Sequence, residues 1–329
     1  MNYVADLKLK KYKGSRKFVK KEFYSNGKLL ISGEYLVLNG ALALAVPTKF
    51  GQRMEVEEEP AGENILFWKS FDQENKIWAE VQFSKDDLMP FRETLKTIDA
   101  EVYDKLQKIL KECRRSNPAF LKNGGSTIVN NYLNFDRAWG LGSSSTLLSN
   151  LAQFANADAL QLNKIVFGGS GYDIACARSG KPVFFRIDQE GPIYDSVNFS
   201  PPNPEQIFFI HLNQKQNSKT AVEEFLARNE KFEEEVEIIS EISEALLFCD
   251  EFPDFMQLIQ EHEEVIQFVL QEERIQTKLF PDFNGIVKSL GAWGGDFVMA
   301  ASEMDRDEII NYFKQKNYPT ILNYSDMVL

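Results

Sequence analysis

Three glycine-rich segments of the sequence carry residues that can bind or transfer a phosphate group. The most informative, residues 140–145, runs Gly-Leu-Gly-Ser-Ser-Ser. Its glycines allow a tight turn and close approach to a ligand. The helix predicted after it offers free N–H groups and a positive dipole end to an anion. Its hydroxyls can contact phosphate oxygens or magnesium. An ordinary serine cap after a flexible turn is the alternative. No Gly-Lys-Ser/Thr follows, which excludes a Walker A loop.

The other two glycine-rich segments differ in the residue that follows them. Residues 168–172 lead into Asp173, whose carboxylate can orient or deprotonate a hydroxyl nucleophile in a cleft. A turn or cap role for this aspartate is the alternative. Residues 291–295 allow close backbone approach to a ligand, or they form a simple bend before a strand.

A phosphoryl group in transfer also needs a cation, because its negative charge is spread over several oxygens. Lys28 stands among apolar residues on a predicted strand, where a buried charge needs a partner. A lysine on the solvent face of an edge strand is the alternative.

The composition predicts a soluble globular protein of about two domains. The chain has 329 residues, 43% of them hydrophobic, and a formal charge of −12. This acidic balance disfavours a general nucleic-acid binder. Three widely spaced cysteines indicate neither a zinc ribbon nor a disulfide framework. With no apolar run of about 18 residues and no secretory signal, we expect a cytoplasmic protein that does not bind membranes.

The elements that must position these residues mix strands and helices without a regular βαβ rhythm, which predicts an α+β fold. Apolar runs at 28–31, 35–38 and 41–46 predict strands, with a turn at Asn39 and Gly40 and an end at Pro47. Further strands are predicted within 65–83 and at 126–135, 183–187, 207–212 and 297–300, and helices at 99–113, 146–157, 305–314 and across most of 220–274.

Two blocks of charge and one proline cluster complete the pattern. Residues 8–21 carry eight bases and no acid; we interpret them as a solvated lead-in rather than an RNA- or membrane-binding arm, since the charges are not accompanied by a pattern of aromatic residues suited to base stacking. Residues 223–273 carry 17 acids and two bases, which favours a solvated helix face over an acidic docking surface. Prolines at 201–204 predict a break between domains at 1–200 and 201–329.

In this order, the segments resemble the motifs of the GHMP kinase superfamily. Residues 27–38 resemble its first motif, 140–145 its Gly-Leu-Gly-Ser-Ser-Ala phosphate loop, 170–175 its Ser-Gly-x-Asp segment and 291–295 its third motif. Residues 33–38 and 169–176, together with Lys288, Ser289 and Asp296, are most similar to the mevalonate kinase and phosphomevalonate kinase branch.

The resemblance implies a two-domain α+β fold with a cleft between the domains. The N-terminal, nucleotide-binding domain would have a left-handed βαβ crossover, and the C-terminal domain would be ferredoxin-like. It further implies a kinase that uses ATP and Mg²⁺ to phosphorylate a small hydroxyl or phosphate acceptor, mevalonate or phosphomevalonate, in isoprenoid biosynthesis. The expected partner is this small-molecule substrate and not a nucleic acid or membrane, and a homodimer is left open.

The residue roles follow from the same resemblance. Asp173 would orient or deprotonate the acceptor, and Lys28 would stabilise the transferring charge and keep Asp173 ionised. The nucleotide would be bound by Gly140, Leu141, Gly142, Ser143, Ser144 and Ser145, with Ser144 also the magnesium ligand. The substrate site would include Glu34, Ser170, Gly171, Gly291, Gly294 and Gly295, with Glu34 positioning Lys28 or substrate.

Three departures from the family pattern leave an alternative function open. Trp139 follows Ala138 where a proline is usual, and Trp293 replaces a small residue and is expected to narrow the cleft. No acid lies between Asp158 and Asp173, where mevalonate kinase has a glutamate for magnesium. Magnesium would then rely on Ser144, ATP and water. Alternatively, the protein is a non-catalytic nucleotide or metabolite sensor. A diphosphomevalonate decarboxylase is a further alternative, but the sequence fits the kinases better.

Overall fold

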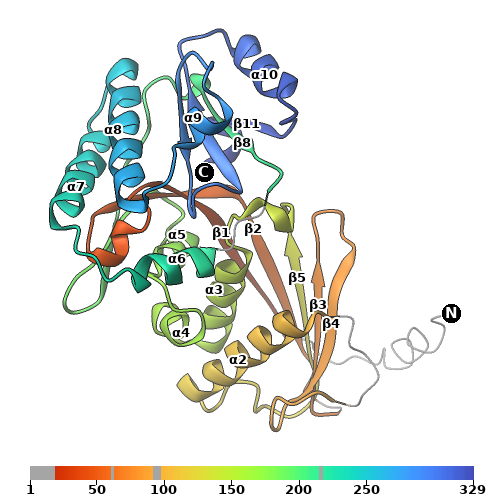
Figure 1. The fold of residues 1–329 in the computed structure, drawn as a ribbon. Helices are drawn as coiled ribbons and strands as arrows, with labels where there is room; N and C mark the ends of the chain where they lie inside the picture. Colours follow the sequence, from red (N-terminus) through yellow and green to blue (C-terminus); the bar gives the residue numbers. More distant parts are fainter. Residues whose placement is uncertain (1–18, 61–62, 92–97, 215–217) are drawn as a thin grey trace.

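The computed structural model describes residues 19–60, 63–91, 98–214 and 218–329. It has an α+β fold with one large and one small sheet (Figure 1). Most of the basic segment 8–21 lies outside the described residues. None of the described helices combines the length and apolar character that crossing a membrane requires.

The large sheet has the strand order β4-β3-β5-β2-β6-β7, with β1 also paired to β2. These strands are β1 (Val19–Ser32), β2 (Ala43–Glu58), β3 (Ile65–Phe71), β4 (Ile77–Ser84), β5 (Thr127–Leu133), β6 (Val183–Ile187) and β7 (Pro192–Ser196). Both β5 and β6 pair antiparallel with β2, so they run in the same direction. Helices connect them, as in the predicted βαβ crossover.

Helices cover one face of the large sheet (Figure 1). They are α2 (Ala100–Ser116), α3 (Ser143–Ala155), α4 (Ala159–Val166) and α5 (Tyr172–Ser179). The helix α2 begins where the Asp99 side chain accepts hydrogen bonds from two backbone N–H groups, which satisfies donors that the helix leaves unpaired. Its apolar stripe, including Leu106 and Leu110, joins a buried cluster with Trp68 and Phe83 of the sheet.

The small sheet is antiparallel, with the order β11-β8-β10-β9. Its strands are β8 (Ile207–His211), β9 (Ile286–Ser289), β10 (Phe297–Ala301) and β11 (Ile321–Asn323). The helices of the same part of the chain are α6 (Ser218–Ala227), α7 (Glu233–Leu247), α8 (Phe252–Leu270), α9 (Ile275–Leu279), α10 (Arg306–Gln315) and α11 (Tyr324–Met327). The predicted domain boundary after residue 200 falls between β7 and β8, and it stays a prediction.

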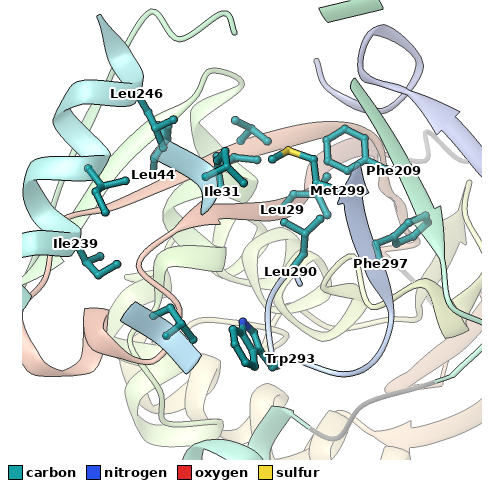
Figure 2. Packing of buried hydrophobic residues seen from close by; sticks show 14 of the residues in the cluster. Leu29, Ile31, Leu44, Phe209, Ile239, Leu246, Leu290, Trp293, Phe297 and Met299 are labelled. Carbon is teal, nitrogen blue, oxygen red and sulfur yellow. The ribbon is translucent and has the colours of Figure 1, made fainter. Parts of the chain in front are cut away.

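One hydrophobic cluster joins the two sheets. Leu29 and Leu44 of the large sheet share it with Phe209 and Met299 of the small sheet, and Leu246 of α7 packs beside them (Figure 2). Burying such side chains stabilises the fold by about 1.5–3 kcal/mol each. The apolar packing therefore sets the position of one sheet relative to the other, so that residues from both can contribute to one site.

Two local predictions in the first segment are wrong. Residues 36–39 form a short 3₁₀ turn instead of a strand. This turn ends at Gly40, which has the left-handed conformation. The strand β2 does not stop at Pro47 but continues to Glu58. Proline is tolerated because β6 pairs with residues 43–45 and β5 with residues 52–58, so Pro47 lies between these partners, where a missing N–H costs little.

Candidate active site

The segment 140–142 forms the turn that leads into α3. Gly140 and Gly142 have φ angles of 64° and 86°, in the region that favours glycine. Between them, Leu141 is buried, and its carbonyl accepts a hydrogen bond of 3.1 Å from the backbone N–H of Lys28. The turn is therefore tied directly to β1, and it ends at the N-terminus of a helix, where an anion is stabilised.

Buried polar contacts fix α3 on the sheet. The Ser25 hydroxyl lies 2.8 Å from both Ser149 Oγ and Asn150 Oδ1. Asn150 donates to the Gln52 carbonyl at 2.9 Å, and the Thr146 hydroxyl donates to Gln52 Oε1 at 2.7 Å. Because such contacts are directional and costly to break when buried, they hold the first turn of α3 in a defined place and orientation.

The three serines at the start of α3 face different surroundings. Ser144 is exposed and Ser143 is half-buried, so both are accessible to a ligand at the helix N-terminus. Ser145 is buried, and its hydroxyl donates to Oδ2 of Asp173. The side chain of Ser145 thus contacts the candidate catalytic aspartate, whereas the sequence predicted that it binds nucleotide.

Asp173 lies in the first turn of α5, which follows Gly171 in the left-handed conformation with φ 92°. A Cβ atom at Gly171 would come within 3.0 Å of Leu160, so close packing also favours glycine here. The Ser170 hydroxyl accepts a 3.4 Å contact from the Tyr172 backbone N–H. The half-buried carboxylate of Asp173 is therefore presented at a helix N-terminus next to α3.

Lys28 lies on β1 beside a register shift between Asn26 and Lys28. Its Nζ donates to the Gly140 carbonyl at 3.2 Å and stands 5.7 Å from the Tyr172 ring centroid. Burial alone would lower the pKa of Lys28, but Tyr172 and Asp173 outweigh it and raise that pKa. The amine is thus a stable cation between the turn before α3 and the start of α5, so three distant segments meet here.

The third glycine-rich bend lies beside the same place. Gly291 lines a small cavity with Lys28, Gly140 and Asp296. Gly291 and Gly294 have φ angles of 66° and 81°, and a Cβ atom on either would meet nothing within 4 Å. Glycine is therefore required by backbone conformation, and the space beside both residues is open. Gly295 is buried.

Trp293 does not fill that space as the sequence predicted. Its side chain is only 3% exposed and belongs to the cluster that joins the sheets (Figure 2).

A wider surface hollow lies along α8, between Pro253 and Glu264, and reaches Gly285 and Ile286. The charged residues lining it, Glu261 and Glu264, are acidic, so it does not complement a phosphate.

Two further residues lie beside the segment 138–140, and the sequence assigned neither of them a role in the site: His211 at the end of β8, and Asp296, which directly precedes β10. The His211 Nε2 lies 3.3 Å from the Ala138 carbonyl. The Asp296 carboxylate faces Gly140 so closely that a Cβ atom there would lie 2.2 Å from Oδ2. The family resemblance already included Asp296 as the acid that follows the third glycine-rich bend, but its contact with Gly140 depends on the fold.

Glu34 forms a buried ion pair with a residue of the small sheet. Its carboxylate is fully buried, 2.7 Å from Lys288 Nζ and 3.0 Å from His262 Nε2. Burial alone would raise the pKa of Glu34, but Lys288 and His262 outweigh it and lower that pKa to about 2. The ion pairs of Glu34 are therefore with Lys288 and His262 rather than with Lys28, and its proposed role toward substrate stays a prediction.

Comparisons with known proteins give a fold but no close relative. No family profile matches the sequence, and no curated protein matches it significantly. Methanococcus jannaschii mevalonate kinase aligns over 94% of this chain and 98% of its own, with a TM-score of 0.66 and 15% identity. The chain has the fold of the GHMP kinase superfamily.

Other GHMP kinases align over similar lengths. Streptococcus pneumoniae phosphomevalonate kinase, solved with phosphomevalonate and AMPPNP, covers 92% of this chain and 99% of its own (TM-score 0.66, 16% identity). Lactococcus lactis galactokinase, solved with galactose, covers 96% of both chains (TM-score 0.61, 11% identity). Because these GHMP kinases act on different acceptors, the shared fold does not specify the acceptor of this protein.

Proposed function

We propose that this protein is an ATP-dependent kinase that phosphorylates a small molecule. The observation that carries the proposal is the meeting of Lys28 and Asp173 at the N-terminus of α3. Phosphoryl transfer is catalysed chiefly by positioning and charge stabilisation. A cation, a carboxylate and an anion-binding helix end are the groups that this reaction needs.

Each group has a role in the proposed reaction. The backbone of residues 140–142 and the start of α3 bind the ATP phosphates. Asp173 orients the acceptor hydroxyl and takes its proton as the acceptor oxygen bonds to the γ-phosphorus. The bond from the γ-phosphorus to the bridging oxygen breaks, and ADP leaves with the electron pair. Lys28 stabilises the charge on the transferring group.

The residues that we propose around the ATP phosphates suit a Mg²⁺ ion that would enter the site bound to ATP. Within the described ranges, no three His, Cys, Asp or Glu side chains group closely enough to hold a metal ion by themselves. Mg²⁺ commonly keeps several waters and binds through one or two protein ligands plus substrate phosphates. The exposed hydroxyl of Ser144 is one such ligand, and the ion would neutralise phosphate charge.

We propose mevalonate or phosphomevalonate as the acceptor, on the basis of the motif resemblance and the named structural neighbours. An acceptor phosphate needs basic residues near Asp173. Arg137 stacks on Trp78 at 3.7 Å, whereas Arg178 and Lys181 are exposed and follow Asp173 in the sequence, so either is available to contact an acceptor phosphate. Lys215 lies outside the described residues. Both acceptors are therefore kept in the proposal.

The deciding experiment measures ADP release by the purified protein with ATP, Mg²⁺ and a panel of acceptors that includes mevalonate, phosphomevalonate, homoserine and galactose. Turnover with mevalonate or phosphomevalonate is expected. ATP binding without turnover on any acceptor would favour the sensor function instead. Release of carbon dioxide from diphosphomevalonate would assign the protein to the decarboxylases.

A further inference from the structure

The carboxylate of Asp296 lies against the turn that would bind the phosphates of ATP. A Cβ atom on Gly140 would lie 2.2 Å from Asp296 Oδ2 and 2.8 Å from Oδ1, so both oxygens face the backbone of Gly140. Asp296 also lines the cavity shared by Lys28, Gly140 and Gly291. An acid that directly precedes β10 thus enters a site that is otherwise built for an anion.

The backbone around Asp296 holds this carboxylate in place. The Asp296 N–H donates to the Gln214 carbonyl at 2.8 Å, and its carbonyl accepts from the Leu212 N–H at 2.8 Å. Its φ angle is 53°, a left-handed conformation that aspartate and asparagine adopt more readily than most residues. Non-glycine residues in this conformation persist where the surroundings enforce it, and they cluster at functional sites.

The charges around Asp296 do not suit a bare triphosphate. Lys28 is one cation beside two carboxylates, Asp173 and Asp296, both of which act to raise its pKa. ATP would add several negative charges to a place where Asp296 already opposes them. A divalent cation between the carboxylate and the phosphates removes this conflict, because it attracts both.

We infer that Asp296 is the protein carboxylate that contacts the divalent cation bound to the nucleotide. The inference rests on the proposed kinase function and adds to it a carboxylate ligand from the residue that directly precedes β10. One carboxylate, one hydroxyl, phosphate oxygens and water form a set that suits Mg²⁺. Asp296 then makes nucleotide affinity depend on metal, since ATP without metal is repelled.

The test is binding of a non-hydrolysable ATP analogue by calorimetry, in excess Mg²⁺ and in excess chelator, for the wild type and for Asp296→Asn. The wild type is expected to bind about tenfold or more tightly with Mg²⁺. In Asp296→Asn, affinity without metal should rise by about tenfold and the gain from Mg²⁺ should largely disappear. Asparagine tolerates the left-handed backbone, so the fold should be retained, as thermal unfolding will show.

A matched control is Glu303→Gln, an exposed acid that follows β10, which should leave both affinities unchanged. A second measurement uses Mn²⁺, whose free-ion electron paramagnetic resonance signal reports binding to the protein–nucleotide complex. The substitution at Asp296 should weaken Mn²⁺ binding to this complex by about tenfold.

Equal metal dependence in Asp296→Asn and wild type would overturn the inference. Weaker binding with and without metal would show instead that Asp296 acts by positioning Lys28. If the wild type binds no nucleotide at all, the proposed kinase function fails as well.

Discussion

The ammonium group of Lys288 and the carboxylate of Glu34 form an ion pair of 2.7 Å in which neither side chain is exposed. The pair joins the turn after β1 to β9. Two further buried groups of α8 complete it: Glu263 lies 3.2 Å from Lys288, and His262 lies 3.0 Å from Glu34. Beside it, the Tyr35 hydroxyl donates to the Ala292 carbonyl at 2.9 Å. Polar contacts therefore link the segment that contains Glu34 and Tyr35 to the segment that runs from Lys288 to Ala292.

Removing Lys288 should destabilise the protein strongly. In Lys288→Met, Glu34 and Glu263 lose their shared cation and remain buried, which costs about 3–5 kcal/mol. Urea unfolding monitored by circular dichroism measures the change. The double variant with Glu34→Gln should recover part of the loss, because one buried carboxylate is then neutral. An unfolding free energy within about 1 kcal/mol of the wild type would contradict a structural role for this pair.

The same pair predicts how stability depends on pH. The pKa of Glu34 is lowered from 4.5 to about 2 on folding, so its ionised form is favoured by the folded state. Its contribution to stability is complete above pH 4.5 and is lost as pH falls toward 2. Urea midpoints of Glu34→Gln should therefore fall less steeply than those of the wild type over this interval. Parallel curves would show that Glu34 does not carry this acid sensitivity.

Asp173→Asn should lower kcat by about 100-fold or more while leaving nucleotide affinity within about threefold. The amide keeps the size of the side chain and its contact with Ser145, but it does not accept a proton from the acceptor. Steady-state ADP release and calorimetry with a non-hydrolysable analogue measure the two quantities. Wild-type turnover in this variant would remove Asp173 from the mechanism.

Lys28→Met should also reduce turnover by about 100-fold or more, since the transferring group loses its cation. Methionine retains most of the apolar stem, which lies beside Gly142, where a Cβ atom would come within 3.4 Å of Lys28 Cε. Lys181→Met, at an exposed lysine, is the matched control and should retain wild-type kcat. If both variants keep full activity, the charge that stabilises transfer comes from another residue.

Ser145→Ala separates two roles for the third serine. Its hydroxyl donates to Asp173, so its removal should lower kcat by about tenfold through a less fixed carboxylate, with the KM for ATP little changed. Ser144→Ala should instead raise the KM for ATP, because Ser144 is exposed at the helix N-terminus. A rise in KM with unchanged kcat for Ser145→Ala would favour the phosphate-binding role that the sequence predicted.

The irregular mixture of strands and helices predicted the α+β class, and the order of the motifs predicted the fold, which the structural neighbours confirm. It did so because glycines with positive φ and a serine-rich helix start are local features that a sequence displays directly. Most strands and helices were also recognisable from their apolar periodicity. The turn at residues 36–39 was not, since its apolar residues Leu36 and Val37 are buried and resemble a strand.

The partners of charged residues were not predictable, because they depend on contacts between distant segments. Glu34 and Lys288 are 254 positions apart, and no local pattern indicates that they pair. Likewise, Asp296 approaches Gly140 only because β10 brings it there. The Ser145 contact with Asp173 had a weak signal: a serine where the resembling motif has alanine.

The apolar cluster shared by the two sheets limits the motions available during a catalytic cycle. Rotating one sheet away from the other as a rigid body would expose Leu29, Leu44, Phe209 and Met299 to water and would pull apart the enclosed charges around Lys288. If the protein is the proposed kinase, nucleotide would enter and product would leave by displacement of short loops at the rim, such as the one carrying Gly291 and Gly294, rather than by a hinge between the halves.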